Sequence, residues 1–219
     1  ATVVVTCIDE TNANETLKLL SGSGHSVFKY DVTDFQSAQG LLKTIVQKYN
    51  RPPNILVNSA GVLIITSIFD VTPESFQKSL DVNLKGTFFT SQAVCKELSA
   101  ANLPGSIVNI SSIAGNLGTE ALGCYSASKA GVNAITKCMA KDMGQYHIRV
   151  NCVEPGLIKT PMIVDGFGSK CHVTEDSWIS QLATKRIGQP REVAEVIAFL
   201  SSDRASYING ANISINGGH

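Results

Sequence analysis

Short apolar runs rich in β-branched residues alternate with segments of helical periodicity along the whole chain. The expected strands cover residues 2–6, 26–30, 55–57, 106–110, 148–153 and 211–215. The expected helices include residues 10–20, a segment ending at Tyr49, one starting at Pro73, one carrying Tyr125 and one starting at Pro190. Strands of about five residues that alternate with helices are typical of a parallel sheet covered on both faces. The pattern therefore predicts an α/β fold with a doubly wound, mostly parallel sheet of Rossmann type.

Helix starts are marked by capping residues and prolines. Thr33, followed by Gln36 three positions later, reads as a capping box that opens the helix ending at Tyr49. Pro73 and Pro190 stand at first helical positions, where a missing N–H costs nothing. In the helix of Tyr125, the apolar positions 132, 135, 139 and 143 form the predicted buried side.

The chain reads as one domain, residues 1–219, without internal repeats or low-complexity linkers. Doubly wound nucleotide folds carry a Gly-rich turn between their first strand and first helix, and no such turn occurs near Ala1. If residues 2–6 form the second strand, a first strand, a Gly-rich loop and a first helix are expected to precede them.

Composition excludes several classes of protein. With 43% apolar and 16% charged residues and a formal net charge of zero, a compact globular protein is expected, and nucleic acid is not an expected partner. No apolar run approaches the roughly 18 residues of a membrane-spanning helix. The six cysteines form no Cys-x-x-Cys motif, which favours reduced thiols in an intracellular protein, and the four histidines lack metal-ligand spacing. No metal site is expected.

Tyr125 and Lys129 are the most informative residues. Four residues make about one helical turn, so the phenol and the ammonium should lie side by side on one helix face. A neighbouring cation favours the phenolate and is expected to lower the pKa of the tyrosine, which gives a general acid/base usable near neutral pH. Ser112, thirteen residues upstream, could hold a substrate oxygen beside it. By itself, such a pair is also common among ordinary helix-surface neighbours.

Further motifs surround this pair in a specific order, and together they resemble the short-chain dehydrogenase/reductase family along nearly the whole chain. The motifs are Asn58-Ser59-Ala60-Gly61, Asp81-Val82-Asn83-Leu84-Lys85-Gly86, Asn109-Ile110-Ser111-Ser112, Tyr125 to Lys129, Arg149-Val150-Asn151 and Pro155-Gly156-Leu157-Ile158-Lys159-Thr160.

The resemblance implies a catalytic tetrad of Asn83, Ser112, Tyr125 and Lys129. Tyr125 would exchange a proton with the substrate, Ser112 would polarise its oxygen, and Lys129 would tune the tyrosine and grip the nicotinamide ribose. Asn83 would hold a water that links Lys129 to solvent. Ser111 and Ser112 could instead cap backbone groups at a strand end, and Asn83 could be a helix-interior amide bonded to a carbonyl.

The resemblance also implies a nicotinamide dinucleotide. Nothing basic lies between Thr6 and Asn14, and Asp9 or Glu10 would repel a 2′-phosphate, which favours NAD over NADP without excluding the latter. Besides Tyr125 and Lys129, the implied cofactor contacts are Cys7, Ile8, Asp9, Asp31, Val32, Asn58, Ser59, Ala60, Gly61, Pro155, Gly156, Ile158 and Thr160.

Within the family, a narrower resemblance is to the type 8 17β-hydroxysteroid dehydrogenase group, which is also similar to the 3-oxoacyl-carrier-protein reductases. The runs that carry it are Arg51-Pro52-Pro53, Asn83-Leu84-Lys85-Gly86-Thr87-Phe88, Pro104-Gly105-Ser106-Ile107 and Tyr207-Ile208-Asn209-Gly210. This resemblance implies hydride transfer between NAD(H) and a secondary alcohol or ketone, with a hydroxysteroid or a 3-hydroxyacyl/3-oxoacyl thioester as the substrate. Residues 114–124 and 162–178 are expected to line the substrate pocket, although the second segment could equally form a surface helical hairpin.

Two other functions stay open, namely a sugar or polyol dehydrogenase on the same scaffold and a non-catalytic nucleotide-binding subunit. The resemblance further implies a homo- or hetero-tetramer, and a location in the mitochondrial matrix, with the cytoplasm as the alternative.

Overall fold

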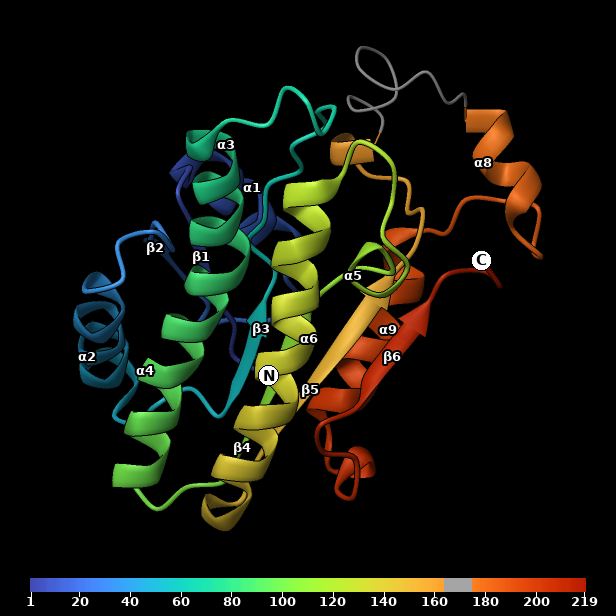
Figure 1. Ribbon diagram of the computed structural model, residues 1–219. Helices are drawn as coiled ribbons and strands as arrows, with labels where there is room; N and C mark the ends of the chain where they lie inside the picture. Colours follow the sequence, from blue (N-terminus) through green and yellow to red (C-terminus); the bar gives the residue numbers. More distant parts are fainter. Residues whose placement is uncertain (164–174) are drawn as a thin grey trace.

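The computed structural model describes residues 1–163 and 175–219 (Figure 1). The strands are β1 Val4–Cys7, β2 Ser26–Lys29, β3 Ile55–Asn58, β4 Gly105–Ile110, β5 Ile148–Pro155 and β6 Asn212–Ile215. The α-helices are α1 Glu10–Leu19, α2 Ser37–Tyr49, α3 Pro73–Ser79, α4 Gly86–Ala100, α5 Ala114–Leu117, α6 Gly123–Met143, α8 Glu175–Gln181 and α9 Pro190–Ser201. Short helical turns cover Leu80–Lys85 (η1), Gly144–Tyr146 (η2) and Asp203–Ala205 (η3).

All strand pairs in the described part of the chain are parallel. The order β3-β4-β5-β6 forms one sheet, and β1 pairs with β2 in a separate two-stranded sheet. In the view of Figure 1 the smaller sheet lies on the side of β3 away from β6. On β3, the side chains of Ile55 and Val57 are 43% and 39% exposed. The prediction of a parallel α/β fold is confirmed, whereas the further strand expected before residue 2 stays a prediction.

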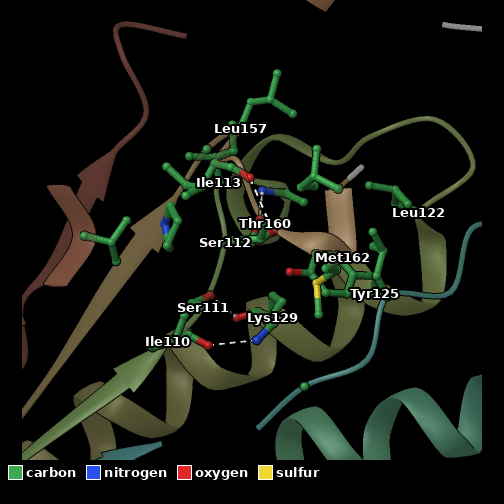
Figure 2. A pocket seen from close by; sticks show the side chains of 18 of the residues that line it. Ile110, Ser111, Ser112, Ile113, Leu122, Tyr125, Lys129, Leu157, Thr160 and Met162 are labelled. Carbon is green, nitrogen blue, oxygen red and sulfur yellow. Dashed lines mark hydrogen bonds between the residues drawn. The ribbon is translucent and has the colours of Figure 1, made fainter. Parts of the chain in front are cut away.

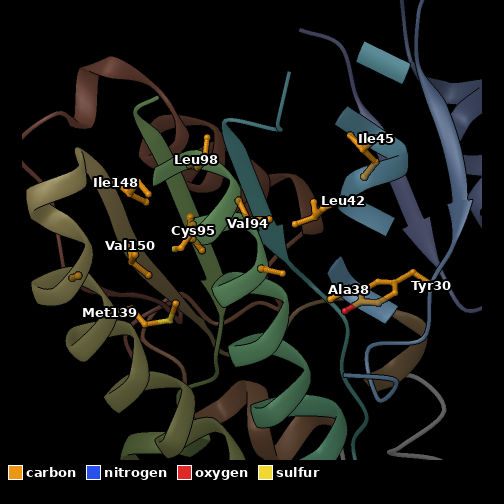
Figure 3. Packing of buried hydrophobic residues seen from close by; sticks show 13 residues of the cluster. Tyr30, Ala38, Leu42, Ile45, Val94, Cys95, Leu98, Met139, Ile148 and Val150 are labelled. Carbon is orange, nitrogen blue, oxygen red and sulfur yellow. The ribbon is translucent and has the colours of Figure 1, made fainter. Parts of the chain in front are cut away.

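Helices cover both faces of the larger sheet because consecutive strand residues point to opposite sides. In β4, Ile107 belongs to a core cluster shared with α2, α4 and α6, whereas the next residue, Val108, belongs to a second cluster with α9. Figure 3 shows the first cluster, in which Leu98 of α4 and Met139 of α6 flank Ile148 and Val150 of β5. Of the predicted buried face of α6, Val132 and Met139 are buried.

Most predicted element starts are confirmed, but the start of α2 is wrong. Thr72 caps α3 and accepts a hydrogen bond from the N–H of Ser75, as the Pro73 signal indicates. Helix α2 instead begins at Ser37, and Thr33 is not its cap. The backbone N–H and the hydroxyl of Thr33 both donate to Asp31 Oδ1, at 2.9 and 2.7 Å, so this side chain stays in a turn before the helix.

A buried chain of polar side chains joins the two strands that approach the candidate site. Asn58, at the end of β3, donates through Nδ2 to Ser91 Oγ and to Asn109 Oδ1, both at 2.8 Å. Asn109 of β4 in turn donates to Thr136 Oγ1 of α6 at 2.9 Å. Because these groups are buried, each needs its partner. The network fixes β3 and β4 against α4 and α6.

In the described residues, no helix is long and apolar enough to cross a membrane. The same residues contain no group of three or more His, Cys, Asp or Glu side chains arranged to hold a metal ion. The five cysteines that the structure describes are all free thiols.

Replacing Asn58 by Ala should destabilise the protein by about 2–3 kcal/mol, because the buried Oδ1 of Asn109 would lose its donor. Urea unfolding measures this loss. The matched control is Asn14→Ala on the exposed face of α1, for which the change should stay within about 0.5 kcal/mol. Equal stabilities of Asn58→Ala and the control would refute a structural role for the network.

Candidate active site

A cavity of about 490 Å³ opens at the carboxyl ends of β3, β4 and β5. Its wall includes Ser59 and Gly61 after β3, Ser111 to Ala114 after β4, and the segment from Pro155 to Ile163, except Lys159, that begins at the end of β5. The first turns of α6 add Tyr125 and Lys129 (Figure 2). Ligands of open parallel sheets bind at this edge of the strands, so the cavity is the candidate active site.

Ser112 and Tyr125 both line this cavity, and the Ser112 hydroxyl acts on the phenol by lowering its pKa. The Ser112 hydroxyl also accepts a bond from the N–H of Ala114 at 3.2 Å, so it caps the start of the short helix α5 as well. Ser111 has a purely structural environment, because it is buried and its hydroxyl donates to the backbone oxygen of Lys129. The structure thus separates the two serines, and only Ser112 reaches the tyrosine.

Lys129 is almost completely buried, with 5% of its surface exposed, and its Nζ donates to the backbone oxygen of Ile110 at 2.8 Å. The same nitrogen lies over the ring of Tyr125, 5.6 Å from the ring centroid. Burial disfavours the ammonium and lowers the pKa of Lys129 from 10.5 to about 8. The amine therefore titrates close to physiological pH.

The expected lowering of the Tyr125 pKa is wrong for this structure. Burial raises the pKa of Tyr125 above 10, and the Ser112 hydroxyl opposes this rise without cancelling it. The reason is geometric: Lys129 lies over the ring rather than at the phenolic oxygen, and it donates its hydrogen bond to Ile110. Tyr125 is thus a protonated phenol at neutral pH.

Asn83 lies in η1, a π-helical turn that interrupts the path from α3 to α4. Its Oδ1 accepts the N–H of Val62 at 2.8 Å, and its Nδ2 donates to the oxygen of Val62 at 3.0 Å and to Ser128 Oγ at 3.0 Å. Ser128 Oγ then donates to the backbone oxygen of Tyr125 at 2.7 Å. Asn83 therefore ties the loop after β3 to α6, and π-turns of this kind are frequent at functional sites.

A side chain at position 61 would crowd the polar side chains of the site. A Cβ on Gly61 would come within 3.3 Å of Asn83 Oδ1 and 3.7 Å of Lys129 Nζ. Gly61 thus keeps the floor of the cavity open beside the amine.

Comparison with known proteins places this arrangement in a family. The family model described as enoyl-(acyl carrier protein) reductase matches residues 1–219. Human (3R)-3-hydroxyacyl-CoA dehydrogenase is 35% identical over 227 residues, covering 100% of this chain and 85% of the relative. The 3-oxoacyl-[acyl-carrier-protein] reductase of Thermotoga maritima is 38% identical, covering 100% of this chain and 87% of the relative. The chain belongs to the short-chain dehydrogenase/reductase family.

A hydroxysteroid dehydrogenase and two solved structures agree with this assignment of fold and family. The 3-alpha-(or 20-beta)-hydroxysteroid dehydrogenase of Mycobacterium tuberculosis is 43% identical over 165 residues, covering 75% of this chain and 60% of the relative. A putative short-chain alcohol dehydrogenase from Sinorhizobium meliloti superposes with a TM-score of 0.89 at 30% identity, covering 100% of this chain and 86% of that chain. A structure described as ribose-5-phosphate isomerase from Brucella melitensis superposes with a TM-score of 0.91 at 30% identity, covering 100% of this chain and 82% of that chain.

As a short-chain dehydrogenase/reductase, the protein is an oxidoreductase that acts on CH–OH groups with a nicotinamide cofactor. Of the residues predicted to contact this cofactor, the structure brings a first set to the cavity wall. This set comprises Ser59, Gly61, Tyr125, Lys129, Pro155, Gly156, Ile158 and Thr160.

The other predicted contacts do not line the cavity. Asn58 points into the buried polar network described above, and Val32 lies against Gly86, where a Cβ would come within 2.8 Å of Val32 Cγ2. The carboxylate of Asp31 accepts from Thr33, which lowers its pKa. Outside the cavity are therefore Cys7, Ile8, Asp9, Asp31, Val32, Asn58 and Ala60, and Asn83 lies behind the wall.

Asp9 follows β1 and caps α1. Its Oδ1 accepts from the N–H groups of Thr11 at 2.8 Å and Asn12 at 3.4 Å, and its Oδ2 accepts from Asn12 Nδ2 at 3.0 Å. Capping holds the carboxylate at the end of β1, where its charge repels a further anion. Ile8 is 60% exposed beside it.

The predicted substrate walls are present in part. Ala114, Thr119, Glu120 and Leu122 line the cavity from the first predicted segment, and Met162, Ile163 and Trp178 line it from the second. Residues 164–174 of the second segment lie outside the described residues. The sequence analysis missed two walls, namely Leu63 and Ile65 after β3 and Val193, Ala194 and Ile197 of α9. The apolar stripe of α9 was a detectable signal, but it also packs against the sheet.

Replacing Lys129 by Met should make the stability difference from wild type depend on pH. Unfolded Lys129 keeps its proton up to about pH 10.5, whereas folded Lys129 loses it near pH 8, so wild-type stability should rise between these values. The pH-dependent part of the difference should be at most about 3 kcal/mol, measured by thermal unfolding from pH 7 to 10.5. Lys137→Met, on an exposed position of α6, should show no such slope; a flat Lys129→Met difference would contradict the buried-amine assignment.

Proposed function

We propose that this protein interconverts secondary alcohols and ketones with NAD(H), using Tyr125 as the proton-transfer group. The observation that carries the proposal is that Ser112, Tyr125 and Lys129 line one apolar cavity, with the Lys129 Nζ over the Tyr125 ring. A carbonyl oxygen that accepts from both hydroxyls would lie against the two groups able to stabilise its developing negative charge.

The high pKa of Tyr125 suits the reductive direction at neutral pH, because the phenol holds the proton that a developing alkoxide needs. Ser112 orients the same oxygen. Lys129 loses its own proton near pH 8, so below that pH its ammonium can resupply the proton that Tyr125 gives to the substrate.

The nicotinamide side of the cavity fits the expected cofactor. A lysine ammonium has three N–H donors, and one of those of Lys129 is given to Ile110, which leaves donors for ribose hydroxyls. Lys129, Gly61 and the segment from Pro155 to Thr160 would hold the nicotinamide end. When bound, the nicotinamide supplies or accepts the hydride. The protein residues position the carbonyl and handle the proton.

Substrates follow from the relatives and from the cavity. Relatives named as 3-hydroxyacyl-CoA dehydrogenase, 3-oxoacyl-[acyl-carrier-protein] reductase and hydroxysteroid dehydrogenase support a 3-hydroxyacyl/3-oxoacyl thioester or a hydroxysteroid. A polyol is disfavoured, because Leu63, Ile65, Leu122 and Ile197 would leave its hydroxyls without partners. Intact proton-transfer chemistry at Tyr125 argues against a subunit that only binds nucleotide.

Replacing Tyr125 by Phe should lower kcat by about 10²–10⁴-fold, because the proton donor is lost while the ring remains. Steady-state reduction of an apolar ketone with NADH measures this effect. Quenching of Trp178, the chain's one tryptophan and a cavity residue, should show that ketone binding is retained. Tyr146→Phe, at an exposed position after α6, is the control. A Tyr125→Phe enzyme with wild-type turnover would exclude the proposed mechanism.

We propose NAD as the preferred cofactor because of the carboxylate of Asp9. NADH should exceed NADPH in kcat/KM by about tenfold or more, given the unfavourable contact of a 2′-phosphate with an anion. Asp9→Ser should narrow this ratio while preserving α1, since serine is also a good N-cap. A ratio unchanged by Asp9→Ser would assign cofactor choice to other residues.

The proposals for assembly and location rest on the family resemblance. We propose a homo- or hetero-tetramer that assembles through α4 and α6, for which sedimentation velocity is the direct measurement. The mitochondrial matrix is the proposed location, with the cytoplasm as the alternative, and imaging of the full gene product would decide between them.

A further inference from the structure

One residue of the cavity wall comes from α8, a helix that carries none of the proposed proton-transfer groups. Trp178 of α8 lines the cavity together with residues of α9. Just beyond α8, Leu182 is 1% exposed and anchors the end of the helix in the core. The indole of Trp178 is only half-buried. Its position in the wall therefore depends on what touches it outside the cavity.

The segment that follows β6 turns back toward α8 (Figure 1). Gly217 and Gly218 have φ angles of +66° and +78°, which glycine adopts without strain. Asn216 closes the turn, because its Oδ1 accepts from the N–H of Gly218 at 3.1 Å. The Nδ2 of the same side chain donates to the backbone oxygen of His219 at 3.5 Å. The direction of His219 is thus set by the turn at 216–219.

This turn is held tightly against the residues that follow α8. The N–H of Thr184 donates to the backbone oxygen of Gly217 at 3.0 Å. A Cβ on Gly217 would come within 2.5 Å of Thr184 Oγ1, and a Cβ on Gly218 within 2.7 Å of Ala183 Cβ. Side chains at 217 and 218 would push the two segments apart, so the glycines fix His219 relative to α8.

The imidazole of His219 lies against the indole of Trp178. The ring centroids are 5.9 Å apart and the ring planes are inclined by 31°. Aromatic pairs at this separation attract each other beyond the effect of burial alone. His219 is exposed and is not among the described lining residues, whereas Trp178 is. The imidazole therefore contacts the indole from outside the cavity.

We propose that His219 is a positioning residue that determines substrate specificity: it holds the Trp178 indole in the wall and so sets the room for a bulky apolar substrate. The effect on catalysis rests on the proposed function, but the ring contact does not. Because Ser112 follows β4 and Tyr125 lies on α6, the proton-transfer groups are positioned by other elements than α8. Loss of the contact should thus weaken the binding of large ketones and spare the chemical step.

The contact itself is tested by fluorescence, because Trp178 is the chain's one tryptophan. His219→Ala should make the indole more accessible to acrylamide, which is measured as stronger quenching of its emission. His219→Phe should stay near wild type, since an aromatic ring is retained. The matched control is Tyr207→Ala, which removes an aromatic ring that is fully exposed, and it should leave the quenching unchanged.

The effect on specificity is tested by steady-state reduction of progesterone and of cyclohexanone with NADH. His219→Ala should raise KM for progesterone about 3- to 10-fold, the loss expected for one aromatic pair. The value of kcat, and the KM for cyclohexanone, should stay near wild type. In a Trp178→Ala background, His219→Ala should have no further effect on either KM, since the pair is already broken.

Unchanged acrylamide quenching in His219→Ala would overturn the proposal. So would an equal rise in KM for the two ketones, a full effect of His219→Ala without Trp178, or failure of the wild-type protein to bind progesterone in equilibrium dialysis. The proposed function fails separately. Wild-type protein that binds progesterone but reduces neither ketone would refute the function alone, because quenching and dialysis measure the contact and its effect on binding without turnover.

Discussion

The site depends on a buried amine held by the end of a strand. Lys129 Nζ donates to the last residue of β4, Ile110, and this bond fixes the first turns of α6 against the carboxyl edge of the sheet. Taking an ammonium out of water is costly, and the lowered pKa of Lys129 is the measure of that cost. A side chain kept there against its own solvation contributes little to stability, so its burial points to chemistry rather than to packing.

Around that amine, buried amides replace the apolar packing seen elsewhere. Asn58 and Asn109 connect β3 and β4 to the helices, and Asn83 connects the loop after β3 to α6 through Val62 and Ser128. Such networks hold side chains in one arrangement because every unpaired member is expensive. The backbone of Tyr125, which accepts from Ser128 Oγ, is therefore held by directional bonds rather than by adjustable hydrophobic contacts.

Much of this arrangement can be read from the sequence because its signals are local. Alternating β-branched runs and helical periodicity predict the parallel sheet. Tyr125 and Lys129, four residues apart, lie on one face of a helix independently of its tertiary contacts. The predictions that are wrong concern residues for which several partners compete. Thr33 donates to Asp31 instead of capping α2, and the amide of Asn58 turns into the buried network. Burial outweighs the effect of Lys129 on the pKa of Tyr125. The wall of α9 was equally hard to foresee, because the same stripe packs on β4 and β5.

The π-turn at Leu80–Lys85 makes the register of a helix part of the site. A π-turn holds one residue more than the α-helical path around it, and each residue of an α-helix rotates the following side chain by about 100°. Deleting Val82 from this turn would restore a regular helix and rotate Asn83 away from Val62 without removing a polar side chain. The attachment of the loop after β3 to Asn83 therefore depends on the number of residues in the π-turn as much as on their identity.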